Sequence, residues 1–400
     1  MPDLVALDIP GGVEFVNALE RIWDNGDAAA PLDPRLSPAS TRSLIATLRP
    51  NSVVTRDSTL TKLPDGVPVE NGDALVMATS GSSGEPKGVI LTHQAIESSA
   101  QATNKRLKVD PSRHSWLACL PLSHVGGLGV VTRAMLSGTP LTVLDGFDAN
   151  EVETIARSGH ATHTSLVATA LRRVDPLLFE CILLGGAAPP NELAPNVVTT
   201  YGMTETASGL VYDSVPLDGV EVAIGTGAPG CGASGEILIR APMLFRAYRS
   251  FRSDRTDRVD LDSDIENAKT MRIGGPDGLG NWFPTGDAGS LDAHGHLHVY
   301  GRIAEVIVTG GEKVWPIAVE RVISGCAGVR EVAVWKRKDV EWGERVVAWV
   351  VAQEGVSLRL DSLREQVADA IAPWAAPKEL VIVESLPRSP LGKVLRKHLT

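Results

Sequence analysis

An apolar run that leads directly into a glycine- and hydroxyl-rich segment constrains this chain more than any other feature. Residues 74–77 (Ala-Leu-Val-Met) are typical of a buried strand, and residues 79–88 (Thr-Ser-Gly-Ser-Ser-Gly-Glu-Pro-Lys-Gly) follow closely. The glycines let backbone amides curl around an anion, the Ser and Thr residues add donors, and Lys87 adds positive charge. The pattern predicts a phosphate-binding loop that a strand delivers to a sheet edge.

Two other interpretations of this loop exist, a P-loop and a flexible linker. A P-loop needs Gly-Lys-Ser/Thr at its end, where a helix N-terminus cradles the phosphates. Here Lys87 lies between Pro86 and Gly88, so the P-loop interpretation fails. A Gly/Ser-rich linker stays open on this segment alone, and only the rest of the chain can decide against it.

Size, charge and cysteine content define the class of protein. A chain of 400 residues is long enough for about two domains with a large core, and its net charge of −10 argues against nucleic-acid binding. The four cysteines (119, 181, 231 and 326) lie far apart among apolar or small neighbours without metal-binding spacing. The N-terminus lacks the basic and apolar parts of a signal peptide. We therefore expect a cytoplasmic enzyme with buried thiols.

One uncharged stretch, residues 115–132, has the length of a membrane span. Pro121, Ser123, His124 and several glycines interrupt it, so we expect no membrane insertion.

Alternating strand and helix patterns predict the fold class. Strand-like runs at 115–120, 141–144 and 181–184 alternate with helical patterns at 125–136, 149–157 and 165–174. This alternation predicts a large N-terminal domain of α/β layers. Short strands between Gly-rich turns after residue 225, such as 235–240, predict a small β-subdomain. The polar stretch 250–281 is interpreted as an insertion or long loop to which we assign no role.

A small α+β unit is predicted at the C-terminus, which places a domain boundary between residues 301 and 302. We expect strands at 306–309, 329–336, 345–353 and 379–383, and helices at 316–324 and 360–372. About 100 residues is enough for a domain. The predicted domains are residues 1–301 and a mobile lid at 302–400.

Several short motifs suit nucleotide chemistry, although each is also compatible with an ordinary turn. In Tyr-Gly-Met-Thr-Glu-Thr (201–206), a carboxylate beside hydroxyls suits Mg²⁺ held together with substrate phosphates. Asp287 follows a tight turn and can accept hydrogen bonds from ribose hydroxyls. The small residues at 185–187 allow a flat ring to lie on the backbone.

Two further motifs lie near the predicted boundary and the C-terminus. Glycines at 301 and 310–311 suit a hinge that absorbs backbone change. Lys393, braced by Pro387 and Pro390, can neutralise charge that develops in a transition state, although on this motif alone a basic C-terminal tail is the favoured interpretation.

Together these motifs resemble the ANL superfamily of adenylate-forming enzymes, which includes acyl-CoA synthetases, peptide-synthetase adenylation domains and luciferases. The resemblance covers about residues 70–400. It rests on the Ser/Gly/Lys loop, Tyr-Gly-x-Thr-Glu at 201–205, Thr-Gly-Asp at 285–287, Gly-Arg at 301–302 and the late Gly-Lys at 392–393.

The resemblance implies a reaction in two halves. ATP and a carboxylate give an acyl-adenylate and pyrophosphate; the C-terminal domain then rotates and a thiol attacks the adenylate. ATP, Mg²⁺ and the co-substrate CoA are therefore the expected small molecules. Ala304 stands at the hinge, where members of the superfamily often have Asp or Lys, and it leaves no salt-bridge option.

The resemblance also implies roles for individual residues. The β- and γ-phosphates would contact Thr79, Ser80, Gly81, Ser82, Ser83, Gly84 and Lys87. The rest of the nucleotide would contact Gly186, Ala187 and Tyr201 at adenine, Thr204 at the α-phosphate, and Asp287 and Arg302 at ribose. Glu205 would bind Mg²⁺, Lys393 would bridge the carboxylate and the α-phosphate, and Gly310 and Gly311 would line the CoA path.

Within the superfamily, residues 183–187, 201–206 and 211–220 look like those of a short actinobacterial type of o-succinylbenzoate–CoA ligase. Residues 121–128 resemble the segment that lines the acyl pocket, where His124 would flank the reacting carboxylate beside Gly185 and Thr204. Arg133 is the candidate cation for the second, aromatic carboxylate, because it lies in an otherwise uncharged run; pairing with a local acid is the alternative.

Other activities stay open at this point. Another aryl- or acyl-CoA synthetase and an adenylation enzyme that loads a carrier protein share these motifs. A non-catalytic relative usually loses the lysine or the metal-binding acid, whereas Glu205, Asp287, Arg302 and Lys393 are all present here. The oligomeric state, including a homo-oligomer, is equally open.

Overall fold

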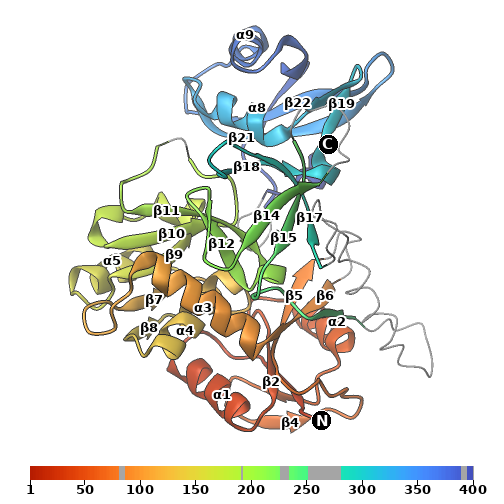
Figure 1. The fold of residues 1–400 in the computed structure, drawn as a ribbon. Helices are drawn as coiled ribbons and strands as arrows, with labels where there is room; N and C mark the ends of the chain where they lie inside the picture. Colours follow the sequence, from red (N-terminus) through yellow and green to blue (C-terminus); the bar gives the residue numbers. More distant parts are fainter. Residues whose placement is uncertain (81–85, 191, 226–233, 251–280, 389–393, 400) are drawn as a thin grey trace. The chain divides into compact units, whose positions relative to one another are not determined.

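The computed structural model describes residues 1–80, 86–190, 192–225, 234–250, 281–388 and 394–399. The chain forms two compact units (Figure 1). The first unit contains Met1–Gly186, Ala194–Glu221 and Arg240–Ile273, and the second contains Ala187–Leu193, Val222–Ile239 and Gly274–Thr400. The predicted boundary at 301/302 falls inside the second unit, at the end of a strand, and stays a prediction.

The first sheet of unit one has seven strands in the order β16-β6-β5-β2-β1-β3-β4. Their bounds are β1 Leu4–Leu7, β2 Ala28–Pro31, β3 Ser52–Val54, β4 Leu60–Lys62, β5 Asp73–Ser80, β6 Pro86–Thr92 and β16 Ala247–Arg249. Strands β1, β2, β3 and β5 run parallel, whereas β6 is antiparallel to β5 and β16 is antiparallel to β6. The predicted strand at 74–77 is therefore the centre of β5.

The second sheet of unit one also has seven strands, in the order β13-β12-β11-β10-β9-β7-β8. Their bounds are β7 Trp116–Ala118, β8 Leu141–Val143, β9 His163–Val167, β10 Cys181–Gly185, β11 Val197–Met203, β12 Ser208–Tyr212 and β13 Val215–Pro216. Strands β7 to β11 are parallel, and β12 and β13 complete the edge in antiparallel pairing.

Helices cover these sheets, and their ends follow from local sequence. They are α1 Val13–Asp24, α2 Pro38–Leu48, α3 His93–Leu107, α4 Val125–Ser137, α5 Ala149–Arg157 and α6 Ala168–Leu171, with the 3₁₀ turn η1 at Pro176–Leu178. The Thr92 side chain caps α3 by accepting from the Ala95 amide at 3.1 Å. Helix α4 ends at Gly138, whose φ of 67° is a left-handed stop. The predicted α/β class is confirmed.

One predicted helix, at 165–174, is wrong in its first part. Residues up to Val167 form β9, which pairs in parallel with β10 on one side and β7 on the other, and only Ala168–Leu171 are helical. A short apolar run in a sheet interior has no periodicity that separates it from a buried helix segment. The pairing of β9 with two neighbouring strands decides its conformation.

The second unit contains two smaller sheets. The four-stranded sheet has the order β14-β15-β17-β18, with β14 Glu221–Gly225, β15 Gly235–Arg240, β17 Phe283–Leu291 and β18 Leu297–Arg302. The five-stranded sheet has the order β20-β19-β22-β21 with β23 beside β22, and its strands are β19 Ile307–Thr309, β20 Glu312–Val314, β21 Val329–Asp339, β22 Gly343–Ala352 and β23 Glu379–Ile382. These strands confirm those expected after residue 225.

Two helices cover one face of the five-stranded sheet. They are α8 Pro316–Ser324 and α9 Leu360–Ala370, both as predicted to within two residues, and the 3₁₀ turns are η3 Ile303–Glu305, η4 Pro373–Ala375 and η5 Arg396–His398. Ile323 of α8 and Val367 of α9 are fully buried in a shared core with Val346 and Val350 of β22. None of the helices in the described ranges is both long and apolar enough to cross a membrane.

Candidate functional site

The predicted phosphate loop begins at the end of β5 and ends at the start of β6. Thr79 pairs with Lys87 and Ser80 with Pro86 in the antiparallel register, so the two strands bring both ends of the loop together. Gly81, Ser82, Ser83 and Gly84 lie outside the described residues. The Thr79 hydroxyl is buried and has no hydrogen-bond partner among the residues described. A buried donor of this kind fits a phosphate oxygen.

Lys87 and Glu205 meet across the two sheets of unit one. Lys87 Nζ lies 3.8 Å from Glu205 Oε1 and 3.3 Å from the centroid of the Tyr248 ring. The Tyr248 hydroxyl donates to the same Glu205 oxygen at 2.8 Å. Tyr248 comes from β16, which pairs with β6 beside Lys87. No sequence pattern indicates Tyr248, because its position depends on the pairing of two strands far apart in the chain.

The Glu205 carboxylate is positioned by a 3₁₀ turn, η2 (Thr204–Thr206). The Thr206 hydroxyl accepts from the Met203 amide at 2.9 Å, and the Glu205 carbonyl accepts from the Phe245 amide at 2.8 Å. In the described part of the chain, no three His, Cys, Asp or Glu residues gather as a metal cage. Mg²⁺ needs only one or two carboxylates when substrate phosphates complete its shell, so a single Glu205 fits.

Glycines stand at the ends of β10 and β11, where a larger side chain would not fit. A Cβ at Gly202 would lie 2.2 Å from the Ser208 carbonyl oxygen, and one at Gly185 would lie 2.7 Å from Thr200 Oγ1. Gly186 has φ of 84°. Because β10 and β11 are parallel neighbours, Gly185 and Gly186 end one strand beside Tyr201 on the next. Ala187 follows in the chain and belongs to the second unit.

His124 caps the N-terminus of α4 with its backbone. Its imidazole makes no capping bond, and Nε2 lies 3.8 Å from Oδ2 of Asp33. Burial, more than any other factor, lowers the pKa of His124, and Asp33 opposes this effect. Asp33 is bound in turn by Arg35, whose Nε donates at 2.8 Å. The sequence pattern identified His124 but not Asp33 or Arg35.

Arg133 lies inside the first unit, on the buried face of α4, with 2% of its surface exposed. Its Nη2 donates to Ser208 Oγ at 2.6 Å, a weaker contact at 3.5 Å reaches Ser165 Oγ, and its guanidinium lies 5.7 Å from the Trp116 ring centroid. No Asp or Glu pairs with it among the described residues. The alternative of a local acidic partner therefore finds no support in this part of the chain.

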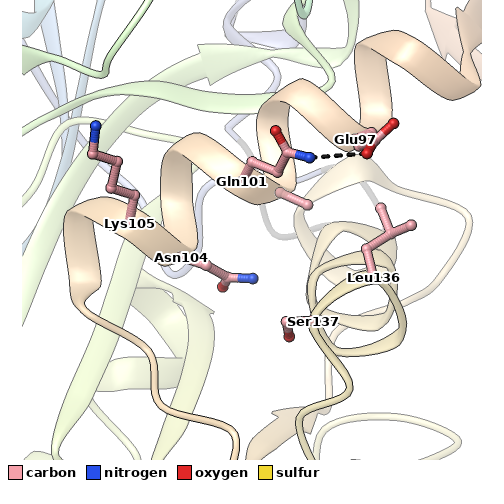
Figure 2. A pocket seen from close by; sticks show the side chains of 7 residues that line it. Glu97, Gln101, Asn104, Lys105, Leu136 and Ser137 are labelled. Carbon is pink, nitrogen blue, oxygen red and sulfur yellow. Dashed lines mark hydrogen bonds between the residues drawn. The ribbon is translucent and has the colours of Figure 1, made fainter.

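The backbone of α4 at Arg133 is held by polar side chains beside a shallow groove between α3 and α4. Figure 2 shows this groove, which has a volume of about 410 Å³, with Asn104 of α3 and Ser137 of α4 on its two sides. The Arg133 carbonyl accepts from Ser137 Oγ at 2.6 Å and from Asn104 Nδ2 at 3.3 Å. These bonds fix the turn of α4 from which the Arg133 side chain extends.

Asp287 and Arg302 lie opposite each other on β17 and β18 of the second unit. Arg302 Nε is 3.0 Å from Asp287 Oδ1, and Arg302 Nη1 donates to the Thr285 carbonyl at 2.9 Å. Asp287 is buried, and the tight turn before it uses Gly286 with φ of 73°. The structure thus brings together the two residues that the resemblance assigned to ribose.

The glycines assigned to the CoA path form the turn between β19 and β20. Gly310 has φ of 59° and Gly311 has φ of 87°. A Cβ at Gly310 would lie 2.7 Å from the Trp342 ring, and the Gly310 amide donates to the Trp342 carbonyl at 3.0 Å. Lys393 lies outside the described residues, and Arg388 and Val394 form an isolated β-bridge on either side of that segment.

Comparisons with known proteins agree with these motifs. Residues 62–249 match the AMP-binding enzyme family, and residues 318–393 match the AMP-binding enzyme C-terminal domain. A probable 2-succinylbenzoate–CoA ligase of Mycobacterium tuberculosis is 36% identical over 366 residues, which are 86% of this chain and 88% of that protein.

Two solved structures of o-succinylbenzoate CoA synthetase (MenE) from Bacillus subtilis are similar in fold. One, in complex with the acyl-adenylate intermediate OSB-AMP, is 26% identical with a TM-score of 0.79, and the similarity covers 100% of this chain and 88% of that one. The other, in complex with ATP and magnesium ion, is 25% identical with a TM-score of 0.81, covering 99% of this chain and 89% of that one.

Proposed function

The chain belongs to the AMP-binding enzyme family, and from this premise we propose that it is an acid–CoA ligase whose acid is 2-succinylbenzoate, an intermediate of menaquinone biosynthesis. In the first half-reaction a carboxylate oxygen attacks the α-phosphorus of ATP, which gives the acyl-adenylate and releases pyrophosphate. In the second, the CoA sulfur attacks the acyl carbon, the acyl–oxygen bond breaks, and AMP leaves. The reaction is proposed for the cytoplasm, where ATP and CoA are supplied.

The observation that carries this choice of acid is the buried Arg133. A guanidinium in an apolar interior is costly unless an anion balances it, and the described residues around it offer two serine hydroxyls and a Trp ring. 2-Succinylbenzoate has two carboxylates, of which only the aliphatic one reacts. The aromatic carboxylate is the proposed partner of Arg133, and His124 is the proposed neighbour of the reacting one, together with Gly185 and Thr204.

The first half-reaction brings one anion to another, so positive charge at the phosphates decides its rate. Lys87 and the Thr79 hydroxyl are proposed to bind the β- and γ-phosphates together with the rest of the loop, and Thr204 to contact the α-phosphate. Mg²⁺, held by Glu205 and phosphate oxygens, would supply further positive charge when bound. Lys393 is proposed to bridge the carboxylate and the α-phosphate.

The nucleoside is assigned to the remaining residues. Asp287 would accept hydrogen bonds from the ribose hydroxyls, since its carboxylate is held in place by Arg302 at 3.0 Å. Gly186, Ala187 and Tyr201 would frame the adenine. The small size of Gly186 and Ala187 leaves their backbone open to a flat ring.

The second half-reaction needs access for a thiol. Rotation of residues 302–400 about the hinge at Ala304 would withdraw Lys393 and bring Gly310 and Gly311 to the CoA path. Ala304 is exposed, so its side chain does not obstruct such a rotation. A carrier-protein thiol in place of CoA is the second candidate.

Pyrophosphate release tests the proposal directly. The enzyme is incubated with Mg²⁺-ATP and a panel of acids, with and without CoA. Release only with 2-succinylbenzoate, together with a CoA-dependent thioester, is the expected result. Release with fatty or simple aryl acids instead would keep the CoA-ligase class and overturn the acid. No release with any acid of the panel would contradict the proposal.

A further inference from the structure

His124 has a buried, charge-compensated carboxylate beside it that no motif of the sequence indicates. Asp33 follows β2, which runs parallel to β5, so it lies at the same sheet edge as the phosphate loop. Its residue exposure is 8%. Arg35 Nε donates to Oδ1 at 2.8 Å, Arg35 Nη2 donates to Oδ2 at 2.6 Å, and the Arg35 amide donates to Oδ1 at 3.0 Å. This bidentate contact of the guanidinium fixes the plane of the carboxylate.

The His124 backbone is fixed, but its imidazole has no structural task in the helix. The carbonyl accepts from the Leu128 amide at 2.9 Å and starts α4, whereas the ring makes no capping bond. About a third of the His124 side chain is exposed (33%), so one side of the ring is open to a ligand. Among the described residues, Asp33 is its one ion-pair partner, at 3.8 Å.

We infer that Asp33, clamped by Arg35, is a positioning residue that orients His124 and stabilises its imidazolium when the reacting carboxylate is bound. This inference rests on the proposed function. With Nε2–H directed to Asp33, the second ring nitrogen Nδ1 can take a proton from solvent and donate it in a hydrogen bond to the incoming carboxylate. The negative charge of the acid is then matched by the positive charge of the imidazolium.

Arg35 explains how an acidic side chain can stand beside a site for an anion. Within the described ranges, the charges that act on His124 are those of Asp33 and Arg35. Without ligand, the effects of Asp33 and Arg35 on the His124 pKa oppose each other, and burial lowers this pKa. The ring is therefore neutral near pH 7. Arg35 also holds the pKa of Asp33 below its usual value. The acid then brings the extra negative charge that raises the His124 pKa, so that binding of the acid is accompanied by proton uptake.

The first test measures the wild-type protein, and a variant serves only to assign the signal. The Cε1–H signal of His124, assigned with the His124→Gln variant, is followed by NMR in the wild-type protein at pH 7 while 2-succinylbenzoate is added. We expect it to move to the shift of a protonated imidazole. A signal that stays at the neutral position in the acid-saturated protein would overturn the inference.

The second test uses the pH dependence of the KM for the acid in pyrophosphate release. In the wild type the KM should rise with pH as His124 loses its proton. Asp33→Asn should raise the KM at pH 7 about tenfold and flatten this pH profile, since the negative charge that faces the imidazolium is lost. The single variant Arg35→Lys, which keeps a positive charge beside Asp33, should keep most of the wild-type pH profile. Arg35→Met, which removes that charge, should not.

Asp292→Asn is the matched control, since Asp292 also faces an imidazole, with its Oδ2 3.0 Å from His296 Nδ1. It should leave the pH profile unchanged. An Asp33→Asn enzyme with a wild-type profile would contradict the inference. Failure of the proposed function is seen separately, because the wild type would then release no pyrophosphate with 2-succinylbenzoate.

Discussion

Lys87 and Glu205 form an ion pair at 3.8 Å that Tyr248 supports from two sides, with its ring under the ammonium and its hydroxyl on the carboxylate. The residue proposed for phosphate and the residue proposed for Mg²⁺ therefore neutralise each other before any nucleotide binds. Binding of Mg²⁺-ATP would exchange this internal pair for two new ones, which would keep the charge of the site balanced.

Tyr248→Phe tests this arrangement. The phenyl ring keeps the contact with Lys87, but the 2.8 Å hydrogen bond to Glu205 is lost. We expect the KM for Mg²⁺-ATP to rise about tenfold while the KM for the acid stays unchanged. Pyrophosphate release at varied Mg²⁺-ATP measures this. Tyr248→Leu, which removes both contacts, should raise this KM further. A Tyr248→Phe enzyme with the wild-type KM for Mg²⁺-ATP would show that the hydroxyl has no role.

Arg133→Met tests the choice of acid. The change keeps much of the buried volume and removes the charge, so the KM for 2-succinylbenzoate should rise about a hundredfold while the KM for ATP stays unchanged. An acid that lacks the aromatic carboxylate, 4-oxo-4-phenylbutanoate, provides the comparison. The wild type should prefer the dicarboxylate strongly, and the variant should have lost this preference.

The control for this prediction is Arg157→Met, because Arg157 is exposed and pairs with Glu153 on the surface. A variant at Arg133 that still distinguishes the two acids as the wild type does would contradict the assignment of the aromatic carboxylate.

Short-range patterns account for what the sequence predicted well. Thr-Gly-Asp at 285–287 and Gly-Arg at 301–302 were recognised as local motifs, and the resemblance assigned Asp287 and Arg302 to the same ribose. The pairing of β17 with β18 brings the two side chains to 3.0 Å. Helix α8 was predicted to the residue, because Pro316 marks its first turn.

Long-range pairing accounts for what the sequence missed. Tyr248 reaches Glu205 only because β16 pairs with β6, and Asp33 reaches His124 only because the two sheets of the first unit lie together. No local pattern encodes such contacts. The same reason explains the error at β9, whose residues become a strand through their two neighbours in the sheet.

Asp287→Asn tests the proposed ribose contact. The amide keeps the shape of the side chain but loses the charge and part of the acceptor capacity for ribose hydroxyls. The KM for ATP should rise about tenfold and the KM for 2′-deoxy-ATP should rise less, so that the two KM values become more alike. Pyrophosphate release with each nucleotide measures this. An equal rise for both would show that Asp287 acts on the fold and not on the 2′-hydroxyl.

Lys393→Ala and Gly310→Ala should separate the two half-reactions. The lysine change should reduce adenylate formation at least a hundredfold but leave thioester formation from supplied acyl-adenylate largely intact. The glycine change should do the reverse, because its Cβ would lie 2.7 Å from the Trp342 ring at a φ of 59°. Equal loss in both half-reactions for either variant would contradict the assignment of that residue to one half-reaction.

The buried His163 of β9 should make the stability of the protein depend on pH. Burial, with a smaller effect of His114, lowers the pKa of His163 to about 4, so the folded protein requires the neutral ring, whereas the unfolded chain takes up a proton near 6.5. The free energy of unfolding is therefore insensitive to this group above about pH 6.5. It falls as the pH drops toward 4, by about 3 kcal/mol in total. The difference in unfolding free energy between wild type and His163→Gln, from urea titrations at pH 7.5, 6 and 5, isolates this contribution from that of the carboxylates. The wild type should lose stability relative to the variant across this range, and a constant difference would show that His163 does not titrate as its burial requires.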